Sequence, residues 1–138
     1  TRVTEILKHA AKEHFAGDMM GLCEAYFENA GRVYEKTKCN IVGHFDLITK
    51  FNERERLFDE DDPRYINAYK KAVDRVMKDC KVFEINTGVV CRGYRTKPYP
   101  SEHIRDYIRQ KGGTFLLSSD SHQKETLCFA FDQFKVLL

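Results

Sequence analysis

Three short segments of the chain combine residues that can bind a metal ion or exchange a proton. They are Gly43-His44-Phe45-Asp46, Glu84-Ile85-Asn86 and Asp120-Ser121-His122. Asp120 and His122 are spaced two residues apart, so in an extended chain both side chains project to the same side. A carboxylate and an imidazole placed together suit Zn, Mn or Fe. We therefore interpret His44, Asp120 and His122 as candidate metal ligands.

Each of these residues also has a structural interpretation. Asp120 could close a polar turn by bonding local backbone, and His44 could be a hydrogen-bonded packing residue. Asp46 is either a partner that orients His44 or a turn residue. Glu84 lies within an apolar segment, where a buried carboxylate needs a partner. We favour a supporting role for Glu84, behind the residues that would touch a ligand.

A basic segment, residues 91–100, carries a second kind of chemistry. It holds three cations and two tyrosines, and one glycine and two prolines constrain it. Arginine presents a planar fork that suits bidentate capture of phosphate. We interpret Arg92 and Arg95 as candidate phosphate-binding residues, next to a metal that would activate water. The alternative is a solvated basic loop.

The elements that must position these residues follow an alternating pattern. Apolar spacing predicts helices at 1–15, 19–38, 101–111 and 125–138 and one that begins at Pro63, with strands at 40–43, 81–86 and 114–118. Residues 44–63, 87–100 and 119–124 are expected to be irregular. Strand, loop and helix in repetition predict an α/β fold, with three parallel strands and covering helices. The three chemically active segments then follow the carboxyl ends of the strands, where α/β folds place their sites.

Composition narrows the class of protein. The chain has 138 residues, a net charge of +2, 42% hydrophobic residues and five cysteines without C-x-x-C spacing. The length predicts one domain, and the near-neutral charge predicts no nucleic-acid partner. No apolar run is long enough for a membrane span. An odd number of cysteines in apolar surroundings favours reduced, packed thiols and a cytoplasmic location.

Taken together, four motifs resemble the histidinol-phosphatase branch of the PHP (polymerase and histidinol phosphatase) superfamily. They are Gly-His-Phe-Asp-Leu-Ile at 43–48, Phe-Glu-Ile-Asn-Thr-Gly at 83–88, Arg-Gly-Tyr-Arg-Thr-Lys-Pro-Tyr-Pro at 92–100 and Ser-Ser-Asp-Ser-His at 118–122.

The resemblance implies a distorted (β/α)7, TIM-like barrel with divalent metal ions at its carboxyl edge. It implies that His44, Asp120 and His122 bind Zn, Mn or Fe and that Arg92 and Arg95 hold a small-molecule phosphomonoester. The implied reaction is hydrolysis of L-histidinol phosphate to L-histidinol and phosphate, a step of histidine biosynthesis.

The chain differs from this family at its N-terminus and in its length. The family begins with an H-x-H strand, which this chain lacks, and the chain has no initiator Met. A barrel of this type needs about 250 residues. We therefore expect residues 1–138 to be a single partial domain, the C-terminal portion of a barrel.

Such a piece would be inactive by itself, because part of its metal coordination shell would be missing. We expect it to associate with the missing barrel half, or with a second copy, through open strand edges. The alternative is a non-catalytic α/β module that binds phosphorylated ligands or keeps the motifs as relics.

Overall fold

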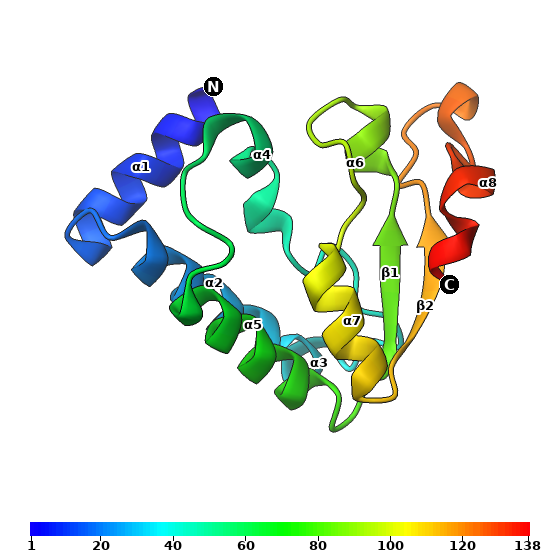
Figure 1. The fold of residues 1–138 in the computed structure, drawn as a ribbon, viewed down its shortest axis with the longest axis horizontal. Helices are drawn as coiled ribbons and strands as arrows, with labels where there is room; N and C mark the ends of the chain where they lie inside the picture. The colour runs from blue at the N-terminus through cyan, green and yellow to red at the C-terminus, as the bar shows by residue number, and fades with distance from the viewer.

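The computed structural model, which describes residues 1–138, contains one parallel sheet of two strands (Figure 1). Strand β1 (Val82–Asn86) pairs with β2 (Thr114–Ser118), and Phe83 lies opposite Phe115. Helix α7 (Glu102–Gln110) connects them in sequence, which makes a βαβ unit. These two strands and the helix between them are confirmed as predicted, so the chain is a mixed α/β protein.

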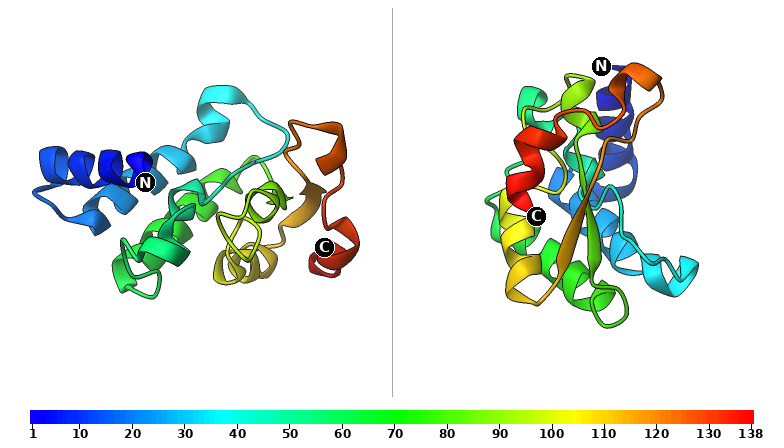
Figure 2. Two further views of the ribbon diagram at one scale, coloured as in Figure 1. Left: turned by 90° about the horizontal axis from the view of Figure 1, so that it is seen from above. Right: turned by 90° about the vertical axis from the view of Figure 1, so that its right-hand side faces the viewer.

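A layer of helices packs beside the sheet. Helices α2 (Met19–Gly31) and α5 (Pro63–Val76) run side by side, and α1 (Arg2–Phe15) contacts α2. Figure 2 shows α1 at one end of the molecule and the sheet with the C-terminus at the other. The core between the helices and the sheet contains these fully or nearly fully buried side chains: Phe27, Tyr65, Val73, Val76, Phe83, Ile104 and Ile108.

Helix α5 shows why the sequence forms this layer. Asp62 caps its first turn by accepting a hydrogen bond from the Arg64 amide at 2.7 Å, and Pro63 occupies the first helical position. Its buried residues recur at helical spacing, namely Tyr65, Tyr69, Ala72, Val73 and Val76. The cap and the apolar stripe together direct one face of α5 into the core.

The predicted third strand at 40–43 is wrong. Only Val42 pairs with β1, in an isolated parallel bridge to Phe83. The Val42 amide donates to the Val82 carbonyl at 2.9 Å, and the Glu84 amide donates to the Val42 carbonyl at 2.8 Å. The chain leaves the sheet at once because His44 adopts a left-handed backbone conformation, with φ of 50°. The sheet therefore has two strands, and the partial barrel expected from the family is not observed.

The predicted helix at 125–138 is also wrong, because the chain breaks into short turns. A 3-10 turn η2 (Lys124–Thr126) is followed by α8 (Phe131–Phe134) and η3 (Lys135–Leu137). Cys128 and Ala130 both have φ of 55°, which interrupts a right-handed helix.

Smaller differences occur elsewhere in the helices. The helix expected over 19–38 divides at Arg32 into α2 and α3 (Val33–Thr37). The segments expected to be irregular contain η1 (Leu47–Thr49), α4 (Asn52–Glu55) and α6 (Gly88–Cys91).

The cysteines form no disulfide. Cys23 and Cys80 are buried, as expected of small apolar side chains, whereas Cys128 is exposed. The cytoplasmic location inferred from the cysteines stays a prediction.

Candidate functional site

Four polar residues meet where the strands end. We call His44, Glu84, Asn86 and Asp120 the strand-end cluster. His44 Nε2 lies 3.1 Å from Asn86 Nδ2, 3.6 Å from Asp120 Oδ2 and 3.9 Å from Glu84 Oε2. In Figure 1 the arrowheads of β1 and β2 point to the same edge, beside α6. The structure thus places the three chemically active segments of the sequence side by side.

Glu84 holds the backbone of His44. Its Oε2 accepts a hydrogen bond from the His44 amide at 3.0 Å, and its Oε1 accepts from Asn86 Nδ2 at 3.2 Å. The side chain of Glu84 is only 11% exposed, so these bonds satisfy a carboxylate that is largely removed from water. A Cβ on Gly43 would lie 2.9 Å from Glu84 Oε2. Gly43 therefore permits the close approach that fixes His44.

Asp120 shares its carboxylate among several positive or potentially positive groups. Arg92 donates through one terminal nitrogen to Asp120 Oδ2 at 2.7 Å and through the other to the Asp120 carbonyl at 3.0 Å. His122 Nε2 lies 3.6 Å from Asp120 Oδ1, although the His122 side chain is 77% exposed. Burial raises the pKa of Asp120, but the Arg92 hydrogen bond and the neighbouring His44, Arg92 and His122 outweigh it and leave the pKa below its ordinary value.

His44 and Asp120 also share an unusual backbone. Asp120 has φ of 46° and His44 has φ of 50°. The left-handed region costs side chains with a Cβ about 1–2 kcal/mol per residue, and such residues gather at functional sites. Five further non-glycine residues of the chain share this conformation, namely Ala16, Lys38, Arg56, Cys128 and Ala130, so it does not by itself mark the cluster as a site.

Asp46 and Arg95 lie in a separate, buried network. Asp46 is fully buried, and its Oδ2 accepts hydrogen bonds from the Ser101 amide at 2.9 Å and the Ser101 hydroxyl at 2.6 Å. Arg95 is 8% exposed, lies 3.7 Å from Asp46 Oδ2 and donates to Thr49 Oγ1 at 2.5 Å. Its guanidinium stacks over the Tyr99 ring, 5.0 Å from the centroid. Asp46 makes no hydrogen bond with His44, and the phosphate-binding role of Arg95 stays a prediction.

Asn86 is the residue that sequence reasoning passed over. It is fully buried, donates to Glu84 and contacts the His44 ring, while its Oδ1 accepts the Gly88 amide at 2.9 Å. The available signal was its position, because it is the polar last residue of a parallel strand.

The donor chemistry of the cluster fits a divalent cation only in part. Two ligands bound to one tetrahedral zinc ion at ordinary bond lengths lie about 3.3–3.6 Å apart. His44 Nε2 and Asp120 Oδ2, at 3.6 Å, match that separation. However, no group of three or more His, Cys, Asp or Glu side chains in the chain is arranged to hold a metal ion. The cluster therefore supplies only two metal donors, His44 Nε2 and Asp120 Oδ2. These two donors do not distinguish one divalent metal from another.

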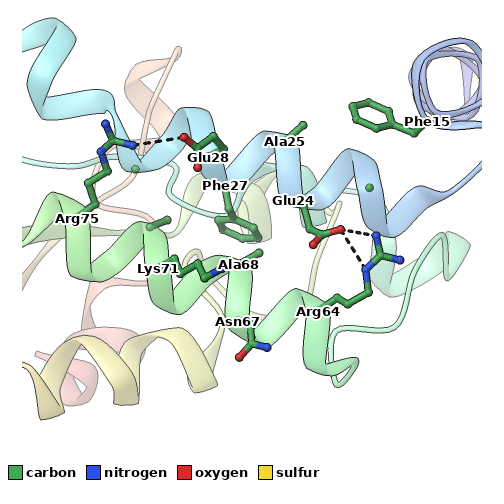
Figure 3. Close-up of a pocket in the computed structure, with 13 residues that line it drawn as sticks. Phe15, Glu24, Ala25, Phe27, Glu28, Arg64, Asn67, Ala68, Lys71 and Arg75 are labelled. Atoms are coloured by element: carbon green, nitrogen blue, oxygen red, sulfur yellow. Dashed lines mark hydrogen bonds and ion pairs between the residues drawn. The ribbon is translucent and has the colours of Figure 1, made fainter.

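A separate groove of about 610 Å³ lies between α2 and α5 (Figure 3). None of the residues predicted for the site lines it. Four of its charged side chains form ion pairs with one another, Arg64 with Glu24 and Arg75 with Glu28. We therefore place the candidate site at the strand ends.

Comparison with known proteins gives an informative similarity. No family model matches the chain. A curated protein named probable histidinol-phosphatase, from Schizosaccharomyces pombe, is 28% identical over 120 residues. The aligned region covers 81% of this chain and 37% of that relative, so the chain spans little more than a third of the relative's length. The chain is thus weakly similar to a histidinol-phosphatase.

None of the helices is both long enough and apolar enough to cross a membrane.

Proposed function

We propose that this chain carries part of the active site of a metal-dependent phosphomonoesterase, with L-histidinol phosphate as its substrate. The observation that carries the proposal is the meeting of His44 and Asp120, 3.6 Å apart, at the carboxyl edge of a parallel sheet. The weak similarity to a probable histidinol-phosphatase supports the same reaction class. The proposal includes that the chain is the C-terminal portion of a distorted (β/α)7 barrel of the PHP superfamily.

Each residue of the cluster has a role in this proposal. His44 Nε2 and the Asp120 carboxylate would bind the divalent cation, and His122 would join them after its exposed ring turns inward. When bound, such a cation makes a water molecule a better nucleophile and neutralises charge on the phosphoryl oxygens. Glu84 holds the His44 backbone through its amide, and Asn86, whose Nδ2 donates to His44 Nε2 in this structure, would have to release that nitrogen to the cation. Arg92 would bind the phosphate.

The second candidate function is a module that binds phosphorylated ligands without hydrolysing them. The absence of a three-donor group favours it. The arginines can bind an anion without a metal, since a guanidinium recognises phosphate through its own N–H groups. This candidate predicts phosphate binding that is independent of divalent cations.

The open edge of β2 supports a proposal about partners. The parallel register places the Phe115 and Leu117 backbone groups on the side of β2 that faces away from β1, where they have no backbone hydrogen-bond partner. Phe115, Leu116 and Leu117 are also only partly buried. We propose that another strand pairs here, from the remaining barrel half or from a second copy. Light scattering that shows a monomer at high concentration would exclude the second copy.

The test is phosphate release from L-histidinol phosphate with Zn²⁺, Mn²⁺ or Fe²⁺ added. We expect the isolated chain to turn over far more slowly than about 1 per second, a rate ordinary for enzymes. The polypeptide encoded by the whole gene should hydrolyse the substrate, and His44→Ala should abolish that hydrolysis. Cation-independent phosphate binding without hydrolysis by the whole gene product would favour the second candidate function instead.

A further inference from the structure

Arg105 is a buried guanidinium on helix α7 that has no carboxylate partner. The residue is only 5% exposed, and its Nη1 donates a hydrogen bond to the carbonyl of Pro100. It forms no ion pair with any aspartate or glutamate of the chain. Arginine is almost never buried to this degree unless it is paired. A buried positive charge whose one partner is a neutral carbonyl is therefore incompletely satisfied.

The unused N–H groups of Arg105 indicate where a partner would bind. Its Nε is enclosed in the protein and has no hydrogen-bond partner. Its Nη2 makes no hydrogen bond either, but it is not fully enclosed, so it belongs to the small exposed part of the side chain. A guanidinium donates from all three nitrogens and cannot lose its charge in a protein. A group that reaches Nη2 from the surface would therefore meet a cation that no carboxylate neutralises.

A second arginine adds to the positive charge on this side of α7. Arg109 follows Arg105 by one helical turn and is 38% exposed. Burial lowers the pKa of Arg105, and the charge of Arg109 lowers it further. The carboxylates of Glu102, Asp46 and Asp106 act in the other direction but do not outweigh these two effects. The surroundings of Arg105 therefore favour the arrival of a negative charge.

Arg95 shows how the chain satisfies another buried guanidinium from within. Its side chain is 8% exposed, lies 3.7 Å from Asp46 Oδ2 and donates a hydrogen bond to Thr49 Oγ1. Arg105 has a single backbone carbonyl in place of that carboxylate. Because an uncompensated buried charge destabilises a fold, an anion that neutralises Arg105 would stabilise the folded chain.

We propose that Arg105 is the cationic group of an oxyanion-binding site on α7. The ligand is a carboxylate or a phosphate group, because a guanidinium binds both through charge-assisted hydrogen bonds. The two sources of such a group are a free anion and an acidic side chain of a segment outside residues 1–138, and the experiment below distinguishes them. No residue of the strand-end cluster bonds to Arg105, so this site does not depend on the proposed function.

The test uses inorganic phosphate as the probe and the 138-residue chain with Arg92→Ala, which removes the phosphate contact proposed at the strand ends. The nitrogen-15 signal of Arg105 Nε should move saturably on phosphate addition, and sodium chloride at the same ionic strength should not move it. At a phosphate concentration about tenfold above the Kd from that titration, the melting temperature should rise by about 3–6 °C. Adding Arg105→Met should abolish this rise. Arg105→Lys, which keeps the charge but not the planar fork, should retain less than about half of it.

Arg75→Met in the same Arg92→Ala background is the matched control. Arg75 lies on α5 and binds Glu35 through Nε at 2.7 Å and through Nη2 at 2.9 Å. The control therefore loses the same charge from an arginine that already has its carboxylate. It should keep the phosphate-induced rise in melting temperature to within about 1 °C. If Arg105→Met does not fold, the response of the Arg105 signal in the parent variant decides the test by itself.

Two results would overturn the oxyanion site. One is an Arg105 signal that phosphate does not move, and the other is a full phosphate-induced rise in melting temperature that persists in Arg105→Met. The same titration of the polypeptide encoded by the whole gene identifies the source of the anion. A signal that already lies at the phosphate-bound position and does not respond to phosphate indicates an acidic side chain of that polypeptide. A signal that starts at the unbound position and moves with phosphate indicates a free anion.

Discussion

Arg92–Asp120 and Arg95–Asp46 are two ion pairs of the same chemistry in opposite environments. The two arginines stand three residues apart, yet the side chains of the first pair are 37% and 26% exposed and those of the second are 8% and 0% exposed. The exposed pair has the shorter contact, 2.7 Å against 3.7 Å. The difference shows that charge and spacing in a loop do not by themselves assign a function to an arginine.

The buried Arg95–Asp46 pair holds distant segments of the chain together. Arg95 connects Thr49 in η1 with Asp46, and Asp46 accepts the amide of Ser101, which precedes α7. These contacts join segments that are 46 and 55 residues apart in the chain. A buried charge that loses its partner is far more costly than an exposed one, because water cannot replace the lost contact. The two pairs should therefore respond very differently to the same substitution.

The largest expected effect is that of Asp46→Ala on stability. It leaves the Arg95 guanidinium buried without its carboxylate and removes two hydrogen bonds from Ser101. We expect the free energy of unfolding to fall by about 3–5 kcal/mol, measured by urea denaturation. Asp46→Asn keeps an acceptor for Ser101 and should lose less. If Asp46→Ala lowers the free energy of unfolding by less than about 1 kcal/mol, Asp46 and Arg95 do not form a buried ion pair in solution.

The next effect concerns catalysis by the whole gene product. Arg92→Ala should lower kcat/KM for the phosphomonoester by about 30- to 150-fold, which corresponds to the loss of about 2–3 kcal/mol from a charge-assisted contact. Steady-state kinetics with metal analysis measure this, and the metal should be retained because arginine does not coordinate cations. Wild-type efficiency in Arg92→Ala would remove Arg92 from the proposed phosphate site.

A smaller effect is expected for Arg92→Ala on the stability of the isolated chain. Its pair with Asp120 is partly exposed, so its loss should change the free energy of unfolding by less than about 1 kcal/mol. Urea denaturation of Arg92→Ala and Asp46→Ala under the same conditions compares their free energies of unfolding directly. If the two variants lose equal stability, the contrast between the exposed and the buried pair is wrong.

The smallest effect is a pH dependence at an exposed pair, Asp18–Arg64. The Arg64 hydrogen bond lowers the pKa of Asp18, which also caps α2 through the Met20 amide. Because the folded pKa lies below the unfolded value, the stabilisation is present above about pH 4 and disappears as the pH falls through the folded pKa. The stability difference between the chain and Asp18→Asn should therefore shrink on acidification. A constant difference from pH 7 to pH 2 would contradict the ionised pair.

Local sequence determined the elements whose signals are strong. The apolar spacing of Tyr65, Tyr69 and Val76 with the Asp62–Pro63 start defined α5, and the apolar runs defined β1 and β2. The helix expected over 125–138 failed because nothing in its residue types announces the left-handed backbone at Cys128 and Ala130. The strand expected over 40–43 failed because a contact of the distant Glu84 with the His44 amide holds the chain in a turn.

The candidate site divides in the same way. Because parallel strands end at one edge of a sheet, sequence alone placed His44, Glu84 and Asp120 near one another. Only the tertiary structure decided that Asn86 touches the His44 ring, that Arg92 neutralises Asp120, and that Arg95 is buried against Asp46. The physical reason is range: strand and helix signals act over a few neighbouring residues. Burial, and with it the strength of a charge pair, depends on segments that only the folded chain brings together.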